Sequence, residues 1–268
     1  MREVRHAFPY ALSRAAFSPR DAARAGDVWR AFQDVAVTAA TLSGWTPRRF
    51  RDAKSAFVMR SMTVVHHREA DFEEALVGES WVSRVRRETF CTREVRLSSD
   101  RGPFVSGTQE WAHLDLERGP SRMPLGMVDE LGLVETNDSV SLPTHDGRGL
   151  GSTHELRFRT FHTWMDPLGH VNHPQYVDFC EEAIAQRLAS VGLDPVLVAP
   201  VAESVSYRAA IVADELVTVT TRVEGRTARG AVVFSHRIGT EREPRSADAI
   251  TVRRLVDGAD DSLFEAFS

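Results

Sequence analysis

The sequence has two cysteines, one lysine and no long apolar segment. Cys91 and Cys180 stand outside any CxxC or zinc-type cluster, so we expect neither a disulfide framework nor a metal site. No stretch approaches the roughly 18 apolar residues that cross a bilayer, and the first residues lack the apolar core of a signal peptide. These scarcities predict a cytoplasmic protein that has no membrane partner.

Excess positive charge is absent as well. The formal net charge is -5 and the isoelectric point is about 6.1, which gives no electrostatic reason to expect a nucleic-acid partner. The hydrophobic share of 42% beside 26% charged residues is that of an ordinary globular protein. A length of 268 residues leaves the choice between one large domain and two smaller ones open.

A weak internal repeat favours two similar halves. Residues 28–47 and 176–195 both have a helical pattern, and their closing Gly and Pro residues are 148 positions apart in the two copies (Gly44, Pro47, Gly192 and Pro195). Each helix is followed by runs typical of strands, at 59–65, 75–85, 89–97 and 107–116 in the first half and at 205–208, 216–223, 231–238 and 249–256 in the second. This order predicts an α+β fold in which a helix lies across an antiparallel sheet, twice over.

The stretch between the halves has a different composition. Residues 119–150 contain several prolines and glycines and show little periodicity, so we expect a linker with at most a short ordered piece. The predicted domains are therefore residues 1–118 and 151–268.

The chemistry-bearing residues gather just before the second helix, where residues 166–172 read Asp-Pro-Leu-Gly-His-Val-Asn. An Asp followed by Pro is by itself a common turn, and an Asn at this place is first a helix cap. Together these residues indicate a reactive site, because a carboxylate can act as a base or nucleophile. Gly169 lets the backbone approach a ligand, and the amides that enter the helix can polarise a carbonyl oxygen.

Over residues 158–190 the chain resembles the hot-dog thioesterases, including the 4-hydroxybenzoyl-CoA thioesterase-like enzymes. Their pattern is roughly D-x-x-G-H-V-N-N-x-x-Y, followed by a helix that carries Glu-Glu-Ala; here His173 replaces the second Asn. The two-copy arrangement is similar to that of the acyl-ACP thioesterases, which have an Asn where this chain has Leu168. The resemblance implies two tandem hot-dog domains, each an antiparallel sheet wrapped around a central helix.

The resemblance also implies an activity. It is hydrolysis of an acyl thioester, carried on acyl carrier protein or coenzyme A, to a free acid of fatty acyl or polyketide type, without a metal or cofactor. Asp166 would be the general base or nucleophile, and one of two glutamates would be a second acidic participant. The expected catalytic residues are Asp166, His170, Asn172, Glu181 and Glu182, and the expected substrate contacts are Gly169, Val171 and Tyr176.

Other interpretations stay open. A hot-dog hydratase or dehydratase would act on the same kind of thioester-bound chain, but its usual Asp-x-Asn-Pro-x-His motif is absent. A second alternative is a non-catalytic acyl-binding or biosynthetic partner protein, which the departures at Leu168 and His173 support. In the first half the corresponding stretch, residues 18–27, has no His-Val-Asn, so we expect one working centre, with the first half as a partner surface. The fused copies would form a monomer with an internal pseudo-dimer, or a homodimer.

Overall fold

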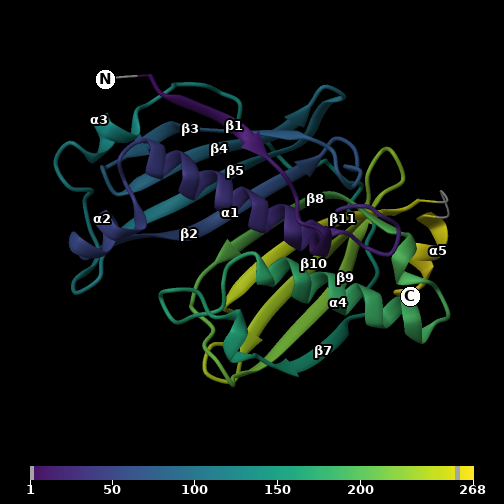
Figure 1. Ribbon diagram of the computed structural model, residues 1–268. Coiled ribbons are helices and arrows are strands. Elements are labelled where there is room, and N and C mark those ends of the chain that lie inside the picture. Colours follow the sequence, from purple (N-terminus) through teal and green to yellow (C-terminus); the bar gives the residue numbers. More distant parts are fainter. Residues whose placement is uncertain (1–2, 257–259) are drawn as a thin grey trace. The chain divides into compact units, whose positions relative to one another are not determined.

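The computed structural model describes residues 3–256 and 260–268, and the chain divides into two compact units (Figure 1). Unit 1 consists of Met1–Phe17 and Val28–Ser141, and unit 2 consists of Ser18–Asp27 and Leu142–Ser268. The expected linker, 119–150, is thus divided between the two units. The short segment 18–27 packs with the second half of the sequence, a long-range association that no local pattern reveals.

In unit 1 a long helix accompanies an antiparallel sheet. The strands follow the order β1, β3, β4, β5, β2, and the helix is α1, Ala25–Leu42. At Gly107 of β5 a Cβ atom would lie 2.2 Å from a ring carbon of Phe32, so a glycine is needed where the helix approaches the sheet. The strand bounds are Arg5–Tyr10 for β1, Ser55–His66 for β2, Leu76–Arg86 for β3, Phe90–Ser99 for β4 and Gly102–Asp115 for β5.

Short elements complete unit 1. They are the 3-10 helix η1 (Arg14–Ala16), α2 (Pro47–Asp52), β6 (Gly119–Pro120) and α3 (Met127–Leu131). Buried Met123, Met127 and Leu131 pack with Trp45, so part of the stretch expected to be a linker contributes to this unit's core. The sequence showed no periodicity there because the ordered piece spans hardly more than one helical turn.

Unit 2 repeats the arrangement. The antiparallel strands follow the order β8, β11, β10, β9, β7, and α4 (Gln175–Ser190) contacts β7, β8 and β9. The strand bounds are His154–Arg159 for β7, Val198–Tyr207 for β8, Leu216–Arg226 for β9, Val232–Thr240 for β10 and Ala247–Leu255 for β11. The 3-10 helices η2 (His162–Trp164) and η3 (Pro195–Leu197) flank α4 in the sequence, and α5 (Asp260–Glu265) follows β11.

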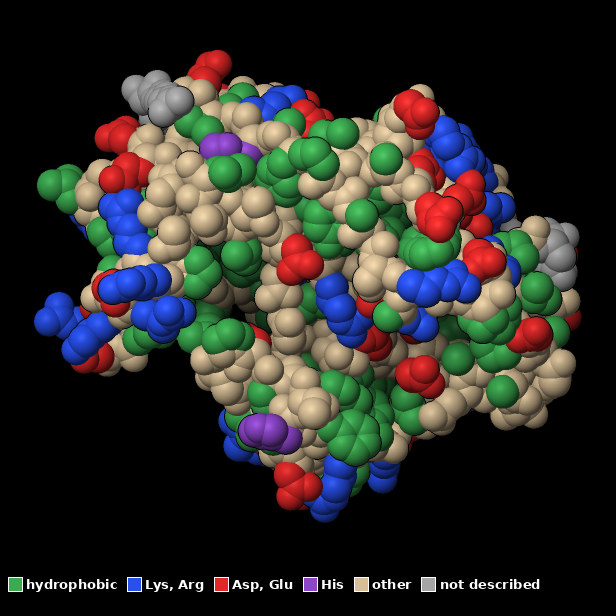
Figure 2. Space-filling model, in the orientation of Figure 1, with side chains coloured by type: hydrophobic (Ala, Val, Ile, Leu, Met, Phe, Trp, Pro, Cys, Tyr) green, Lys and Arg blue, Asp and Glu red, His purple; other side chains and the backbone are tan. Residues whose placement is uncertain are grey.

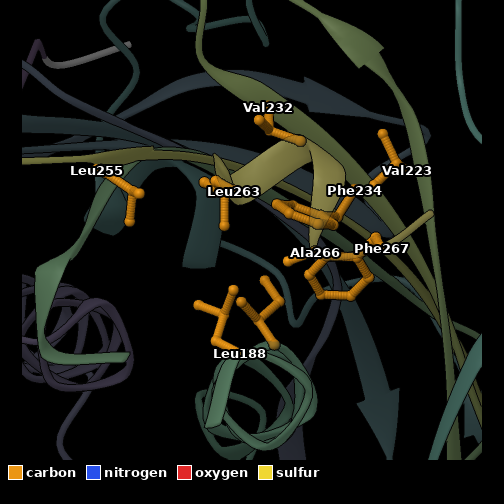
Figure 3. Packing of buried hydrophobic residues seen from close by; sticks show 9 residues of the cluster. Leu188, Val223, Val232, Phe234, Leu255, Leu263, Ala266 and Phe267 are labelled. Carbon is orange, nitrogen blue, oxygen red and sulfur yellow. The ribbon is translucent and has the colours of Figure 1, made fainter. Parts of the chain in front are cut away.

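A hydrophobic core joins α4, the sheet and the C-terminal segment of unit 2 (Figure 3). Leu188 of α4, Phe234 of β10, Leu263 of α5 and Phe267 are each at most 1% exposed. Burying a side chain of this size contributes roughly 1.5–3 kcal/mol to folding. Since α5 closes this core, the C-terminal residues are part of the unit's structure.

The α+β prediction is confirmed in outline, as a sheet-rich antiparallel fold with few helices. Across the described residues, no helix combines the length and the hydrophobicity that a membrane span requires. On the face shown in Figure 2, basic and acidic side chains are interspersed.

Candidate functional site

The loop between η2 and α4 places Asp166 and His170 side by side. The Asp166 N–H donates to the His170 carbonyl oxygen at 2.8 Å, and the Gly169 N–H donates to the Asp166 carbonyl oxygen at 2.9 Å. An antiparallel bridge between Met165 and Val171 closes the loop at its base. Gly169 has a φ of 82°, which glycine adopts without strain. The turn therefore brings two side chains four residues apart to one place.

The Asp166 carboxylate is held by three groups of this loop. Its Oδ1 accepts from the Leu168 N–H at 2.8 Å and from the His170 N–H at 3.4 Å. Its Oδ2 lies 3.3 Å from Nδ1 of His170. The side chains remain 16% exposed for Asp166 and 30% exposed for His170. Both groups are thus oriented by the protein and still accessible to solvent.

The pair shifts the pKa values of both groups. Burial alone would raise the pKa of Asp166, but the hydrogen bond and charge of His170, with the Leu168 and His170 amides, bring it below its usual value. The hydrogen bond to Asp166 raises the pKa of His170 above its usual value, against the opposing effect of burial. The carboxylate is therefore ionised at neutral pH, and the imidazole holds its proton more tightly than a free histidine.

The expected substrate contacts Val171 and Tyr176 are buried, at 4% and 2% exposure. The Val171 N–H donates to the Ile211 carbonyl oxygen at 2.8 Å. The Tyr176 ring packs against Tyr207 with centroids 5.1 Å apart. The Tyr176 side chain thus joins α4 to β8, and the Val171 backbone joins the loop to Ile211, while Gly169 is exposed.

Asn172 and His173 lead into α4. The Asn172 N–H donates to the Trp164 carbonyl oxygen at 2.9 Å, and the Tyr207 hydroxyl donates to the His173 carbonyl oxygen at 2.7 Å. Burial lowers the pKa of His173 to about 3, so its ring is neutral at neutral pH. The helix begins at Gln175, with Pro174 in the cap position. His170 is therefore the imidazole of this motif that carries charge near neutrality.

The structure differs from the sequence-based expectation at the loop amides. The N–H groups of residues 166 and 168–172 all donate to acceptors within the protein: the His170 carbonyl, the Asp166 carboxylate, and the Asp166, Ile211 and Trp164 carbonyls. These amides stabilise the turn and the Asp166 carboxylate. A donor to a thioester oxygen is then better sought among side chains, and His170 is the candidate.

Glu181 and Glu182 line a cavity of about 270 Å³ within unit 2. The charges that act on Glu181 are those of Arg253, Asp178, Glu203 and Asp27, whereas His170 is the charged group that acts on Asp166. The structure thus brings together Asp166 and His170, and gives Glu181 a different electrostatic environment. Cys180, interpreted from the sequence as a small buried hydrophobic residue, is fully buried.

Two residues near the glutamates were missed by sequence reasoning. Arg253 of β11 and Glu203 of β8 form an ion pair with Nη1 2.5 Å from Oε1, and both are at most 1% exposed. Arg253 lies on the inward face of its strand, the same face as Thr251 and Ala249. A charge at an inward position of a predicted strand was the available signal. Within the described part of the chain, no group of three or more His, Cys, Asp or Glu residues could hold a metal ion.

Comparisons with known proteins agree with this architecture. The chain has the fold of a Lactobacillus plantarum protein assigned as an oleoyl thioesterase, at 14% identity and a TM-score of 0.79, with 94% of this chain and 97% of that one covered. It is also similar to the 12:0-ACP thioesterase of Umbellularia californica, at 15% identity and a TM-score of 0.75, with 94% of each chain covered.

A third structure with this fold is an acyl-ACP thioesterase of Bacteroides thetaiotaomicron, at 12% identity and a TM-score of 0.71, with 93% of this chain and 98% of that one covered. No curated protein sequence matches this chain. Residues 168–241, which include His170, match the family model described as the thioesterase superfamily. The resemblance to the hot-dog acyl thioesterases, first indicated by the motif at residues 166–172, is thereby confirmed.

Proposed function

We propose that this chain hydrolyses an acyl thioester, with Asp166 and His170 as its reactive pair. The observation that carries the proposal is the 3.3 Å contact between the Asp166 carboxylate and His170 Nδ1, in an accessible loop that precedes α4. The match to the thioesterase superfamily model includes His170 and begins two residues after Asp166. Geometry and family likeness therefore support the same reaction.

In one form of the proposed reaction, Asp166 takes a proton from water as that water attacks the carbonyl carbon. In the other, Asp166 attacks the carbon itself and forms an acyl–Asp166 anhydride, which water then hydrolyses to the free acid and the regenerated carboxylate. The carbon–sulfur bond breaks, and the thiol leaves with a proton. Since Nδ1 of His170 faces Asp166, its Nε2–H in the protonated ring can donate to the carbonyl oxygen where negative charge develops. Asn172 would orient the water or the substrate.

The pKa shifts support activity over a wide pH range. The lowered pKa of Asp166 keeps the base ionised down to acidic pH, and the raised pKa of His170 keeps its ring protonated further toward neutral pH. The rate is lost on the acid side when Asp166 gains a proton and on the alkaline side when His170 loses one. A bell-shaped profile is the expected signature.

The finer parts of the proposal rest on resemblance. The carrier is acyl carrier protein or coenzyme A, and the acyl chain is of fatty or polyketide type. The two units form tandem hot-dog domains, and the first half, whose loop lacks the Asp–His pair, supplies a partner surface. One of Glu181 and Glu182 would act with Asp166, and Gly169, Val171 and Tyr176 would lie along the substrate path.

A substrate panel tests the proposal directly. The full chain is incubated with acyl-CoA and acyl-ACP thioesters of several lengths, free thiol is measured, and the products are weighed by mass spectrometry. We expect equal amounts of thiol and free acid, with Asp166→Asn as the inactive control. A mass change of one water with the thioester intact would show hydration or dehydration instead. Tight binding without turnover would show an acyl-binding protein.

A further inference from the structure

The cavity that Glu181 lines is built from parts of unit 2 that are far apart in the sequence. Its walls come from the segment 18–25, from α4, from residues 195–200 and from Arg253. The Arg20 Nε–H donates to the Val196 carbonyl oxygen at 2.8 Å, which ties the first of these walls to the third. None of its lining residues belongs to the motif 166–172. It is therefore a second candidate site, separate in composition from the Asp166–His170 pair.

The cavity walls are mostly apolar, and the charged residues among them are Arg20, Arg24, Glu181, Glu182 and Arg253; we call the place where Arg253 meets Glu181 its charged end. Alanine, valine, proline and isoleucine side chains form most of the wall. At the charged end, Nη1 of Arg253 bonds Glu203, while Nη2 has no hydrogen-bond partner among the described residues and lies 3.5 Å from Oε1 of Glu181. A buried donor without an acceptor is costly, so an oxygen atom placed here would be stabilised.

The charges limit what that oxygen can belong to. Arg253 is already paired with Glu203, so a phosphate-like dianion between Arg253 and Glu181 would lie beside two carboxylates with one arginine to balance them. A carboxyl group that shares one proton with Glu181 forms a pair with one negative charge in total. The empty cavity with an ionised Glu181 has the same charge, so binding adds no negative charge. The carboxyl group also supplies an acceptor to Nη2 of Arg253. Its alkyl chain suits the apolar wall.

We propose that this cavity binds a monocarboxylic acid with an apolar chain of about eight carbons, whose carboxyl group meets Arg253 and shares one proton with Glu181. The size follows from the volume, because a cavity of about 150 Å³ holds benzene and this one measures about 270 Å³, room for about ten non-hydrogen atoms. The inference goes beyond the proposed hydrolysis and stands without it.

Proton sharing makes binding depend on pH. Burial raises the pKa of Glu181 to about 7, while the charge of Arg253 lowers it and the neighbouring carboxylates raise it. An ionised ligand binds when Glu181 is protonated, so affinity is full below pH 7 and falls above it. The charged groups that act on Glu181 or line the cavity with it are Arg253 from β11, Glu203 from β8, Asp178 and Glu182 from α4, and Arg20, Arg24 and Asp27 from the segment 18–27.

Isothermal titration calorimetry with octanoate and the full chain tests this. We expect one site with about tenfold lower affinity at pH 8 than at pH 6, since a group of pKa near 7 loses most of its proton between them. Glu181→Gln imitates the protonated carboxyl and should bind equally at both pH values. Octanamide, which cannot share a proton, should bind wild type more weakly than octanoate does at pH 6.

Matched variants locate the site and separate it from hydrolysis. Ala185→Phe fills the cavity and should abolish octanoate binding, whereas Ala189→Phe, one turn along the exposed surface of α4, should not. Asp166→Asn should bind octanoate like wild type even if it hydrolyses nothing. Binding that persists in Ala185→Phe, a pH dependence that persists in Glu181→Gln, or no binding at pH 6 would overturn the proposal. A wild type that binds octanoate but cleaves no thioester would overturn only the proposed function.

Discussion

Two loops of this molecule share a backbone and differ in side chains. Residues 18–22 precede α1, and residues 166–170 precede α4 at an offset of 148 positions. In the first loop the Ser18 N–H donates to the Ala22 carbonyl and the Asp21 N–H to the Ser18 carbonyl, both at 2.9 Å. The corresponding bonds of the second loop measure 2.8 and 2.9 Å. The repeated turn is therefore a structural device that forms without the motif's chemistry.

The side chains of Ser18 and Asp166, the first residues of the two loops, accept corresponding backbone hydrogen bonds. Ser18 Oγ accepts from the Arg20 N–H at 3.3 Å, as Asp166 Oδ1 accepts from the Leu168 N–H at 2.8 Å. What the first loop lacks is the charge of Asp166 and the ring of His170. The scaffold of the turn is thus distinct from the reactive groups that the second loop carries, and four predictions test this distinction.

The largest expected effect is on hydrolysis. Asp166→Asn removes the base but keeps an oxygen for the Leu168 N–H, so the fold should survive while kcat falls by roughly 10²- to 10⁴-fold. Ser18→Ala changes the corresponding position and should leave kcat within about twofold of wild type. Thiol release measures the rates, and melting temperatures show whether each variant is folded. Similar losses in both variants would remove the distinction between the loops.

His170→Ala makes the second loop like the first, which has Ala22 at this position. We expect kcat to fall by roughly 10²- to 10³-fold, as when a donor to the developing oxyanion is removed. Without His170, the pKa of Asp166 should rise, so the acid limb of the pH–rate profile should move to higher pH and the alkaline limb should disappear. A variant profile that overlays the wild-type profile would show that the pair does not act in the reaction.

Local patterns predicted a large part of this molecule. The helices at 175–190 and 25–42 and the strands that follow them were visible because hydrophobic periodicity and terminal Gly and Pro residues are local properties. The motif was visible because Asp166, Gly169 and His170 lie within one turn. Short α5 was not recognised, since its contribution comes from contacts of Leu263 and Phe267 with distant strands.

The rest depended on partners distant in sequence. No local signal says that Ser18–Asp27 packs in unit 2, or that Arg253 meets Glu203 and Glu181. The loop amides were expected to await a substrate oxygen, but a turn this tight uses its own N–H groups, as residues 18–22 also show. Hydrogen-bond partners of a loop follow from its closure, which a motif does not specify.

The third prediction concerns the left-handed residue of each loop. Gly169 has a φ of 82° and Asp21 a φ of 55°. Gly169→Ala meets no atom within 4 Å, so its cost is backbone strain alone, about 1 kcal/mol, or a loss of roughly 3 °C in melting temperature. Asp21→Gly removes a small backbone strain from the folded state but makes the unfolded chain more flexible. These effects oppose each other, so stability should change by less than about 0.5 kcal/mol. Equal changes in melting temperature in the two variants would contradict the larger backbone strain expected for Gly169→Ala.

The smallest expected effect is the contribution of the Asp166–His170 pair to stability, up to about 1 kcal/mol because both side chains are partly exposed. The raised pKa of His170 means that its contribution is present below the unfolded pKa near 6.5 and is lost as the pH rises through the folded value. The lowered pKa of Asp166 means that its contribution is present above the unfolded value near 4 and is lost as the pH falls through the folded one.

The difference in melting temperature between wild type and His170→Ala should therefore be greatest near pH 5–6 and smaller at pH 8. Ser18→Ala, which removes a hydroxyl that does not titrate, should lower the melting temperature by the same amount at every pH, so a pH-dependent cost there would undo the contrast between the two loops.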